Sequence, residues 1–259
     1  MNSLSVLRQV KDRIEPCEVM IMGLEGWLDA GKAASTCTEY IAQKYGGEQV
    51  YVAESDELFN YTVTRPFVRI HKAVIKQLNF PRFEILQVNI KGKNILLVRG
   101  SEPHRMWKKL IIDLLKIADM CEAKLILTFG SMLDDITEIK VSAVVSNVED
   151  IDYLKDIGVD TVEYVGPCSF YTPLIQKCHE IGLRGISLWA HVPYLDYYEI
   201  LARYNMPDWR CSVALLEKAV KITNIDIDLG EAYEKAYEVD SIIRKFRSRG
   251  EADSSKYFL

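Results

Sequence analysis

Apolar runs of strand length alternate with segments of helical periodicity along most of this chain, and this alternation restricts the possible folds more than any other feature. The strand-length runs are mostly apolar, which is typical of strands buried on both faces. They lie at 17–24, 49–55, 124–130, 139–146, 160–166 and 184–192. The segments with helical spacing lie at 29–47, 103–123, 148–158, 169–182 and 206–223. Because parallel strands need a crossover connection, usually a helix, the alternation predicts βαβ units and an α/β fold.

The middle of the chain has a different pattern. Residues 61–80 and 83–100 alternate apolar and polar side chains, and the second stretch contains the turn signal KGKN. This pattern predicts antiparallel hairpins, so we expect a mixed sheet. Since no repeat and no clear linker interrupts the chain before about Thr223, we expect a single α/β domain over 1–223. A C-terminal helix and a flexible tail are expected over 224–259.

The final helix, expected over 228–250, carries acids early and bases late, as the helix dipole favours. Its apolar residues recur in alternating steps of three and four, which gives a seam of about two and a half heptads. These residues are Leu229, Ala232, Ala236, Val239, Ile243 and Phe246. A seam this short has two interpretations, because it can pair with another copy of the chain or pack on its own domain.

Composition excludes several classes of protein. The formal net charge of −5 and the pI of about 5.5 argue against a general nucleic-acid-binding protein, which needs a clustered basic surface. No run reaches the roughly 18–20 apolar residues of a membrane span, and the first residues lack the apolar core of a signal peptide. We therefore expect a cytoplasmic protein with no nucleic-acid or membrane partner. The six cysteines form no C-x-x-C pair, so buried free thiols are expected, with zinc or disulfides as alternatives.

The stretch GLEGWLDAGKAAS, at 23–35, has the spacing G-x-x-x-x-G-K of a phosphate-binding loop between a strand and a helix. That motif also needs Ser or Thr after the lysine to hold Mg²⁺, and this position is Ala33. A tryptophan and a leucine fill the loop as well. We therefore interpret Gly26 and Gly31 as turn and close-packing glycines, and Asp29 as the N-cap of the following helix.

The same stretch resembles the glycine-tryptophan-x-aspartate-alanine-glycine signature of the proteasome assembly chaperone 2 family. Four further blocks agree with that family in order along the chain. They are FNYTVTRPFVRI at 59–70, LLVRGSEPHRMW at 96–107, LTFGSMLDDI at 127–136 and YVGPCSFYTPLIQKCHEIGLRGISLWAHVPYL at 164–195. The resemblance implies a three-layer α/β/α sandwich with a mixed sheet, similar to nucleoside phosphorylases and hydrolases. It also implies self-assembly into trimers or larger rings, and a role in proteasome assembly.

The last three residues are Tyr257, Phe258 and Leu259. Proteasome partners of this kind often end in a hydrophobic residue, a tyrosine and any residue, so this tail is similar but lacks the penultimate phenolic hydroxyl. A polar leader that presents two aromatic rings and a carboxylate suits the capture of a peptide end. The resemblance therefore implies docking of the tail on proteasome α subunits. The alternative is that the apolar end folds back on the body.

A second candidate site is a cleft at the carboxyl ends of the strands, where ligands of open α/β sheets bind. Asp29, Arg65, Glu102, Arg105 and His191 are expected near that edge. In this interpretation an arginine would hold an anion, and the histidine or Glu102 would move a proton. The alternative is that these side chains cap helices and pair with one another to stabilise loops.

The sequence shows no metal-ligand spacing and no G-x-S-x-G nucleophile elbow, so we expect no metal, no cofactor and no catalytic residue. We predict a cytoplasmic, non-enzymatic, homo-oligomeric assembly chaperone for proteasome α subunits. The alternative is a small-molecule-binding protein or an enzyme, directed at a nucleoside or a carboxylate, that uses the cleft.

Overall fold

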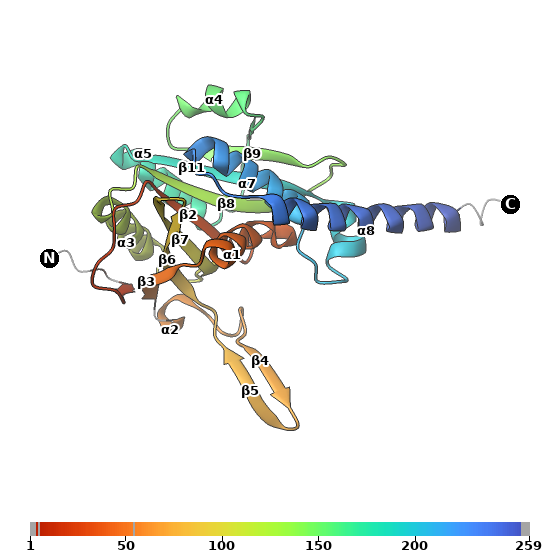
Figure 1. Ribbon diagram of the computed structural model, residues 1–259, viewed down its shortest axis with the longest axis horizontal. Helices are drawn as coiled ribbons and strands as arrows, with labels where there is room; N and C mark the ends of the chain where they lie inside the picture. The colour runs from red at the N-terminus through yellow and green to blue at the C-terminus, as the bar shows by residue number, and fades with distance from the viewer. Residues whose placement is uncertain (1–3, 5, 54, 255–259) are drawn as a thin grey trace.

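The computed structural model describes residue 4 and residues 6–53 and 55–254, and these residues form one nine-stranded mixed sheet with helices on both faces (Figure 1). In spatial order the strands are β1 (Leu7–Gln9), β3 (Glu48–Ala53), β6 (Phe83–Ile90), β7 (Lys93–Ser101), β2 (Val19–Glu25), β8 (Leu125–Asp134), β11 (Arg184–Pro193), β9 (Lys140–Val145) and β10 (Asp160–Thr161). The main helices are α1 (Ala33–Tyr45), α3 (Trp107–Met120), α4 (Asp150–Asp156), α5 (Tyr171–Ile181), α7 (Trp209–Thr223) and α8 (Gly230–Ser254). Short helical turns are η1 (Ala30–Lys32), α2 (Ser55–Leu58), α6 (Tyr194–Asp196) and η2 (Tyr197–Leu201).

The centre of the sheet is parallel and its flanks are mainly antiparallel. Strands β7, β2, β8 and β11 run parallel, so their carboxyl ends meet at one edge. The β6–β7 hairpin turns at the KGKN signal and adds antiparallel pairing, which β3 and β1 continue outward. The predicted mixed sheet is therefore confirmed.

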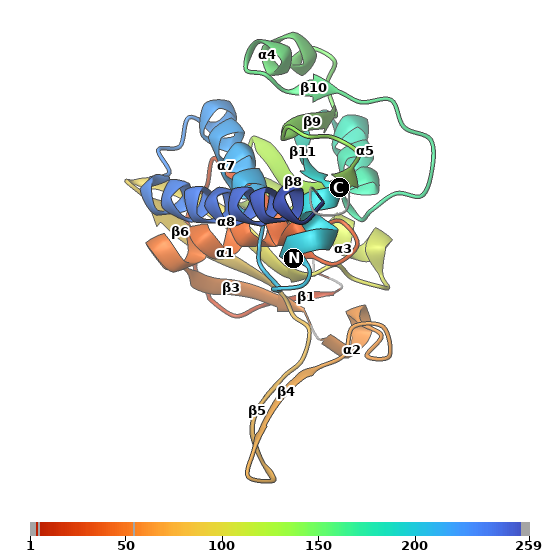
Figure 2. The same cartoon turned by 90° about the vertical axis from the view of Figure 1, so that its right-hand side faces the viewer.

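Two apolar layers enclose the sheet. One face packs against α1 and α7, and the core there includes Ile41, Phe129 and Leu216. The other face packs against α3 and α5, with Leu114 and Leu174 in its core. Figure 2 shows the helices on both sides of the sheet. The predicted three-layer α/β/α sandwich is confirmed, because strands buried on both faces need a helical layer on each side.

Two stretches differ from the sequence-based expectation. The run at 160–166 forms only the two-residue strand β10, and the chain then continues through an exposed loop to Phe170. The hairpin expected over 61–80 does form, as β4 (Phe67–His71) and β5 (Val74–Asn79), but it makes a separate two-stranded sheet. The alternation of apolar and polar residues predicted the two strands. Whether they also pair with the main sheet depends on where the hairpin leaves the body.

The seam of the C-terminal helix packs on its own chain. Ala232 joins the core under α7, and Val239 and Ile243 form a small cluster with Ile200 and Leu201. The helix then runs outward past the body (Figure 1). Of the two interpretations of the seam, the described contacts therefore support packing on its own domain.

The cysteines are free thiols, and five of the six are buried. Cys168 is exposed because it lies in the irregular segment before α5, so the expectation of burial was wrong for this residue. Across the described residues, no helix combines the length and apolar character needed to cross a bilayer. In the same residues no three histidine, cysteine or acidic side chains cluster in a way that could hold a metal ion.

Candidate functional site

The carboxyl end of β2 leads into a tight turn that positions Asp29. Gly26 and Gly31 have positive φ angles of 135° and 61°, which favour glycine. A Cβ on Gly26 would lie 3.1 Å from the Cβ of Glu102, and one on Gly31 would lie 3.3 Å from the Cβ of Asp208. These contacts confirm their interpretation as turn and close-packing glycines. The hydroxyl of Ser131 donates to the carbonyl of Ala30 at 2.8 Å and fixes the turn to the end of β8.

Asp29 caps helix α1 from four residues before its first residue. Its Oδ1 accepts the N–H groups of Ala34 at 2.9 Å and Ser35 at 3.1 Å, and its Oδ2 accepts the Ser35 hydroxyl at 2.5 Å. The predicted capping role is thus confirmed, although the turn η1 intervenes between Asp29 and the helix. Burial of the carboxylate raises the pKa of Asp29 to about 6, while the bonds from Ser35 and Ala34 oppose that rise.

The raised pKa of Asp29 predicts a pH-dependent stability. Between about pH 4 and pH 6 the folded state keeps a proton that the unfolded state has released. The proton on Asp29 therefore stabilises the folded state fully at pH values below the unfolded pKa. This stabilisation is lost as pH rises through about 6. We expect the unfolding free energy of wild type, relative to Asp29→Asn, to fall by roughly 2–2.5 kcal/mol from pH 4 to pH 7, as urea titrations across that range would measure.

The companion variant for this prediction is Ser35→Ala. The Ser35 hydroxyl stabilises the ionised carboxylate, so its loss should raise the pKa of Asp29 further. The decrease in stability should then extend to higher pH than in wild type. Parallel stability curves for wild type and Asp29→Asn would contradict the assignment.

A hollow of about 450 Å³ opens beside Asp29. Its walls come from the β2–α1 turn on one side and from the segment after β11 on the other. The lining residues are Glu25, Gly26, Asp29, Gly31, Lys32, Ser35, Tyr197, Leu201, Ala202, Asn205 and Met206. Lys32 donates to Asn205 Oδ1 at 2.5 Å and joins the two walls. The acceptor atoms of Asp29 are already occupied by α1, so the hollow presents mainly Glu25 and Lys32 as charged groups.

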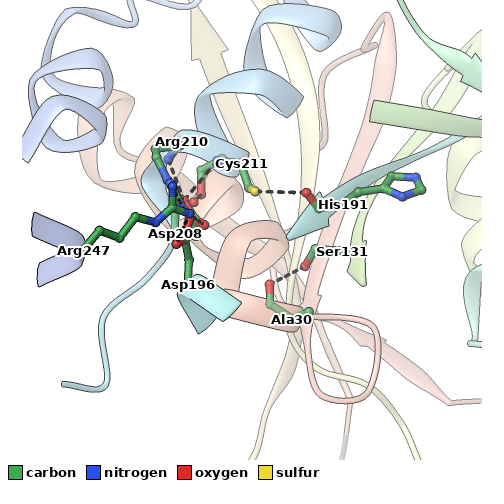
Figure 3. Close-up of polar contacts among 9 residues, drawn as sticks. Ala30, Ser131, His191, Asp196, Asp208, Arg210, Cys211 and Arg247 are labelled. Atoms are coloured by element: carbon green, nitrogen blue, oxygen red, sulfur yellow. Dashed lines mark hydrogen bonds and ion pairs between the residues drawn. The ribbon is translucent and has the colours of Figure 1, made fainter. Parts of the chain in front are cut away.

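An ion-pair network holds the second wall of this hollow, and Figure 3 shows its members together. Arg210 lies between two buried carboxylates, at 3.0 Å from Asp196 and 2.8 Å from Asp208. Arg247 of α8 reaches the other oxygen of Asp196 at 2.5 Å. Burial alone would lower the pKa of Arg210, but the hydrogen bonds and charges of Asp208 and Asp196 raise it. The network therefore ties 194–206, α7 and α8 together.

Of the five predicted cleft residues, the structure brings Asp29 and Glu102 to the same turn. Glu102 accepts the N–H of Phe170 at 2.9 Å, and burial raises its pKa. Arg65 is exposed and lines a different hollow of about 530 Å³ beside the β4–β5 hairpin. Arg105 is exposed two residues before α3 and lines a third hollow. The two arginines thus line separate hollows from Asp29.

His191 lies in a hydrogen-bonded chain with two neighbours. Its Nδ1 is 2.8 Å from Asp134 Oδ2, and its Nε2 is 2.8 Å from the hydroxyl of Ser142. The bond from His191 holds the pKa of Asp134 below its usual range. This order of groups is that of a serine-hydrolase triad. Ser142 is only 2% exposed, however, so the chain connects β8, β11 and β9 rather than presenting a nucleophile.

In Figure 3 the ring of His191 points away from the Asp196–Arg210 cluster, while its carbonyl accepts the Cys211 thiol. Neither the Asp134–His191–Ser142 chain nor the Asp196–Asp208–Arg210–Arg247 network was predicted from the sequence. Asp208 lies directly before α7, and its side chain accepts the N–H groups of Arg210 and Cys211. An aspartate before a helix is a local signal, whereas the other partners meet only in the folded chain.

Comparison with known proteins places this turn and sheet in a family. A model of the PAC2 family matches residues 23–247. The chain belongs to the PAC2 family. The match covers the Asp29 turn, all of α7 and most of α8, so the blocks that carried the resemblance are part of one continuous similarity. No curated protein sequence matches the chain significantly.

Several solved structures have the same architecture as this chain. A PAC2 family protein from Streptomyces avermitilis superposes with a TM-score of 0.74 at 26% identity, covering 93% of this chain and 100% of its own. A proteasome-assembly chaperone homologue from Mycobacterium tuberculosis gives 0.76 at 21% identity, over 89% and 94%. An archaeal proteasome activator from Pyrococcus furiosus gives 0.68 at 18% identity, over 93% and 98%. At 21% and 18% identity, the last two structures establish the shared fold and nothing about function.

Proposed function

We propose that this PAC2 protein is a non-enzymatic, cytoplasmic, homo-oligomeric binding protein that assists proteasome assembly by recognising α subunits. Family membership and the likeness to proteasome-assembly chaperone homologues support a chaperone-like role. The single observation that carries the proposal is the way α8 is held. Helix α8 is a fixed extension of the body, and the predicted docking residues follow it closely in the sequence.

Helix α8 is anchored to the body by apolar packing and by an ion pair. Val239 and Ile243 bury their side chains against Ile200 and Leu201, and Arg247 pairs with Asp196. Beyond these anchors the helix continues to Ser254, outside the body (Figure 1). A helix held at one end and free of the sheet at the other is suited to presenting a recognition segment to a partner.

The predicted recognition residues, Tyr257, Phe258 and Leu259, lie outside the described residues. Their chemistry supports the proposal, because two aromatic rings and a carboxylate can enter a groove between two subunits. We expect one such tail to bind weakly by itself. Several tails on one oligomer can raise the apparent affinity by ~10²–10⁴-fold through effective concentration.

The test is binding of the full chain to the α-subunit ring of the same host. Deleting residues 257–259 is expected to weaken binding at least ~10-fold, because the anchor rings and the carboxylate are both removed. Phe258→Tyr, which supplies the penultimate phenol, is expected to bind as tightly or more tightly. Biolayer interferometry with the immobilised ring would measure all three proteins.

A matched control for the deletion is Tyr204→Ala, which removes an exposed aromatic ring from the body. This variant should bind like wild type. Equal binding by wild type and the deletion would reject docking by the tail. No binding of the full chain to α subunits would reject the partner itself.

The rival proposal is a small-molecule-binding protein or enzyme directed at a nucleoside or carboxylate. The hollow beside Asp29 is the observation that favours it. Its chemistry supports the rival less well, because Arg65 and Arg105 line other hollows and His191 is bonded at both ring nitrogens. A thermal-shift screen with nucleosides and carboxylates tests it, and stabilisation that Lys32→Ala abolishes would favour the rival.

A further inference from the structure

Two cysteines meet at the end of β2 that lies opposite the Asp29 turn. Cys17 comes two residues before β2 begins, and Cys121 directly follows the last residue of α3. The N–H of Cys17 donates to the carbonyl of Cys121 at 2.8 Å, and the N–H of Lys124 donates to the carbonyl of Glu18 at 3.1 Å. These two bonds hold the start of the strand against the end of the helix.

The thiols of this pair lie in one buried cluster and interact with each other. Cys17 is 5% exposed and Cys121 is 3% exposed, and both belong to the core under α3. A hydrogen bond joins the two thiols. It raises the pKa of Cys17, which burial raises further, and it lowers the pKa of Cys121 against the effect of burial. Cys121 is therefore the thiol that ionises more readily, and Cys17 donates to it.

The distance between the two backbones suits a disulfide. Standard bond lengths, added to the 2.8 Å between the nitrogen of Cys17 and the oxygen of Cys121, place the two Cα atoms at most about 6.7 Å apart. Cysteines whose Cα atoms are more than about 7 Å apart cannot be bridged without backbone movement. The thiol–thiol hydrogen bond shows that the side chains also converge. The pair can therefore form a bond without rearrangement of the fold.

The other buried cysteines are arranged differently. The thiol of Cys37 donates to the carbonyl of Ser212 at 3.4 Å, and that of Cys211 donates to the carbonyl of His191 at 3.7 Å. Burial raises the pKa of both of these thiols, and it raises the pKa of Cys178 to about 12. Because the thiolate is the reactive form of cysteine, these three are expected to stay inert.

A buried phenol lies close to the cysteine pair. Tyr51 is fully buried, and its hydroxyl has no hydrogen-bond partner among the described residues. Burial and the charge of Cys121 raise the pKa of Tyr51 to about 12, so the two groups are close enough to interact. A buried hydroxyl without a partner is costly and rare. An oxygen atom added to Cys121 would give this hydroxyl an acceptor.

We propose that Cys17 and Cys121 are a redox-active pair of thiols that hydrogen peroxide converts into a disulfide. First, the Cys121 sulfur attacks the peroxide. The S–O bond forms, the O–O bond breaks, and the departing hydroxide leaves as water with the proton that Cys121 released. Then the Cys17 sulfur attacks the Cys121 sulfur. The S–S bond forms, the S–O bond breaks, and the Cys17 proton leaves in a second water, so two electrons pass from the thiols to the peroxide.

The pair lies directly under the surface, which gives a small oxidant access. The residues on either side of each cysteine are exposed, namely Pro16, Glu18, Met120 and Glu122. Hydrogen peroxide is little larger than water, and the last turn of a helix frays readily. Fraying at the end of α3 therefore admits the oxidant to Cys121 while the body stays folded.

The disulfide would act as a staple between β2 and α3. It closes a loop of roughly 100 residues, and the stabilisation by a disulfide grows with loop length because the unfolded chain loses more entropy. Exposure to peroxide should therefore stabilise the protein. This property goes beyond the proposed function and is measured without α subunits, so either one can fail while the other holds.

The first test is peptide mapping of the wild-type chain. The folded protein is treated with an equimolar amount of hydrogen peroxide, denatured, alkylated without reduction and digested with trypsin. Cleavage after lysine and arginine places Cys17 in peptide 14–32 and Cys121 in peptide 117–124, each without a second cysteine. The two peptides are expected to be linked, with the loss of two hydrogens, and dithiothreitol should separate them. Alkylated Cys17 and Cys121, or linkage of either one to Cys168, would overturn the proposal.

The order of the two steps is tested with serine variants. In Cys17→Ser the sulfenic acid on Cys121 has no thiol to condense with, so dimedone should label peptide 117–124. In Cys121→Ser dimedone should leave Cys17 unlabelled, because burial keeps its thiol protonated. The opposite pattern of labelling would overturn the proposal as written. If a serine variant does not fold, the wild-type peptide map decides.

The staple itself is tested by urea unfolding of oxidised and reduced protein. The midpoint for oxidised wild type is expected to be higher by about 1 M than for protein kept in dithiothreitol. The variant Cys17→Ala should lose this shift. The matched control Cys178→Ala removes a buried cysteine outside the pair and should keep it. Equal midpoints for oxidised and reduced wild type would rule out the staple.

Discussion

Replacing Arg210 by alanine is expected to lower the free energy of unfolding by about 3–5 kcal/mol. The guanidinium lies between Asp196 and Asp208, which are 2% and 0% exposed. Removing it leaves Asp208 buried without its countercharge, and leaves Arg247 as the partner of Asp196 among the described residues. Breaking a buried ion pair by deleting one partner is costly because the other charge stays desolvated. Urea denaturation of wild type and variant at neutral pH measures the difference.

The matched control is Arg244→Ala. Arg244 also pairs with an aspartate, Asp240, but its side chain is 79% exposed on α8. An exposed pair of this kind contributes at most ~0.5 kcal/mol, so this variant should unfold almost like wild type. A loss of less than about 1 kcal/mol for Arg210→Ala would show that the network is not the main link between 194–206 and α7.

Gly100→Ala is expected to destabilise the protein by more than about 4 kcal/mol, enough to leave much of it unfolded. Gly100 has a φ angle of 125°, where residues with a Cβ are strained. A Cβ there would lie 2.0 Å from the carbonyl oxygen of Arg82. That oxygen accepts the N–H of Ser101 at 2.8 Å, and β7 lies between β6 and β2. The backbone therefore has little freedom to move away.

Gly92→Ala separates the backbone strain from the steric clash, which both contribute to the destabilisation expected for Gly100→Ala. Gly92 also has a positive φ, of 90°, but no atom lies within 4 Å of the position a Cβ would take. Only the conformational strain remains, which costs roughly 1–2 kcal/mol. Thermal unfolding of both variants should give a small shift for Gly92→Ala and a failure to fold, or a very large shift, for Gly100→Ala. Shifts of similar size would contradict the steric argument.

Much of the fold could be predicted from local patterns. The runs at 17–24, 124–130 and 184–192 became β2, β8 and β11, because strands buried on both faces need continuous apolar sequence. The helical segment at 103–123 became α3, where helical spacing places Leu110 and Leu114 on one buried face. The segment after β10 was not predicted well, because alternation there reflects an exposed loop.

The candidate site was predictable only in part. Asp29 was found because a capping aspartate acts on residues close to it in sequence, and Gly26 and Gly31 because turns need glycine. The pairing of His191 with Asp134 and Ser142 was not found, because its partners are 57 and 49 residues away. No sequence signal states which distant polar groups will meet.

The α/β class, the order of most elements, the capped turn at Asp29 and the family could all be inferred before folding is considered, since they follow from short-range spacing and from motifs that keep their order. Three other features depend on how the folded chain packs. The tertiary structure placed the hairpin outside the sheet, packed the seam of α8 on its own chain, and joined Asp196, Arg210 and Arg247. Each depends on which surfaces the folded chain brings together, and burial and charge pairing are settled only when those surfaces meet.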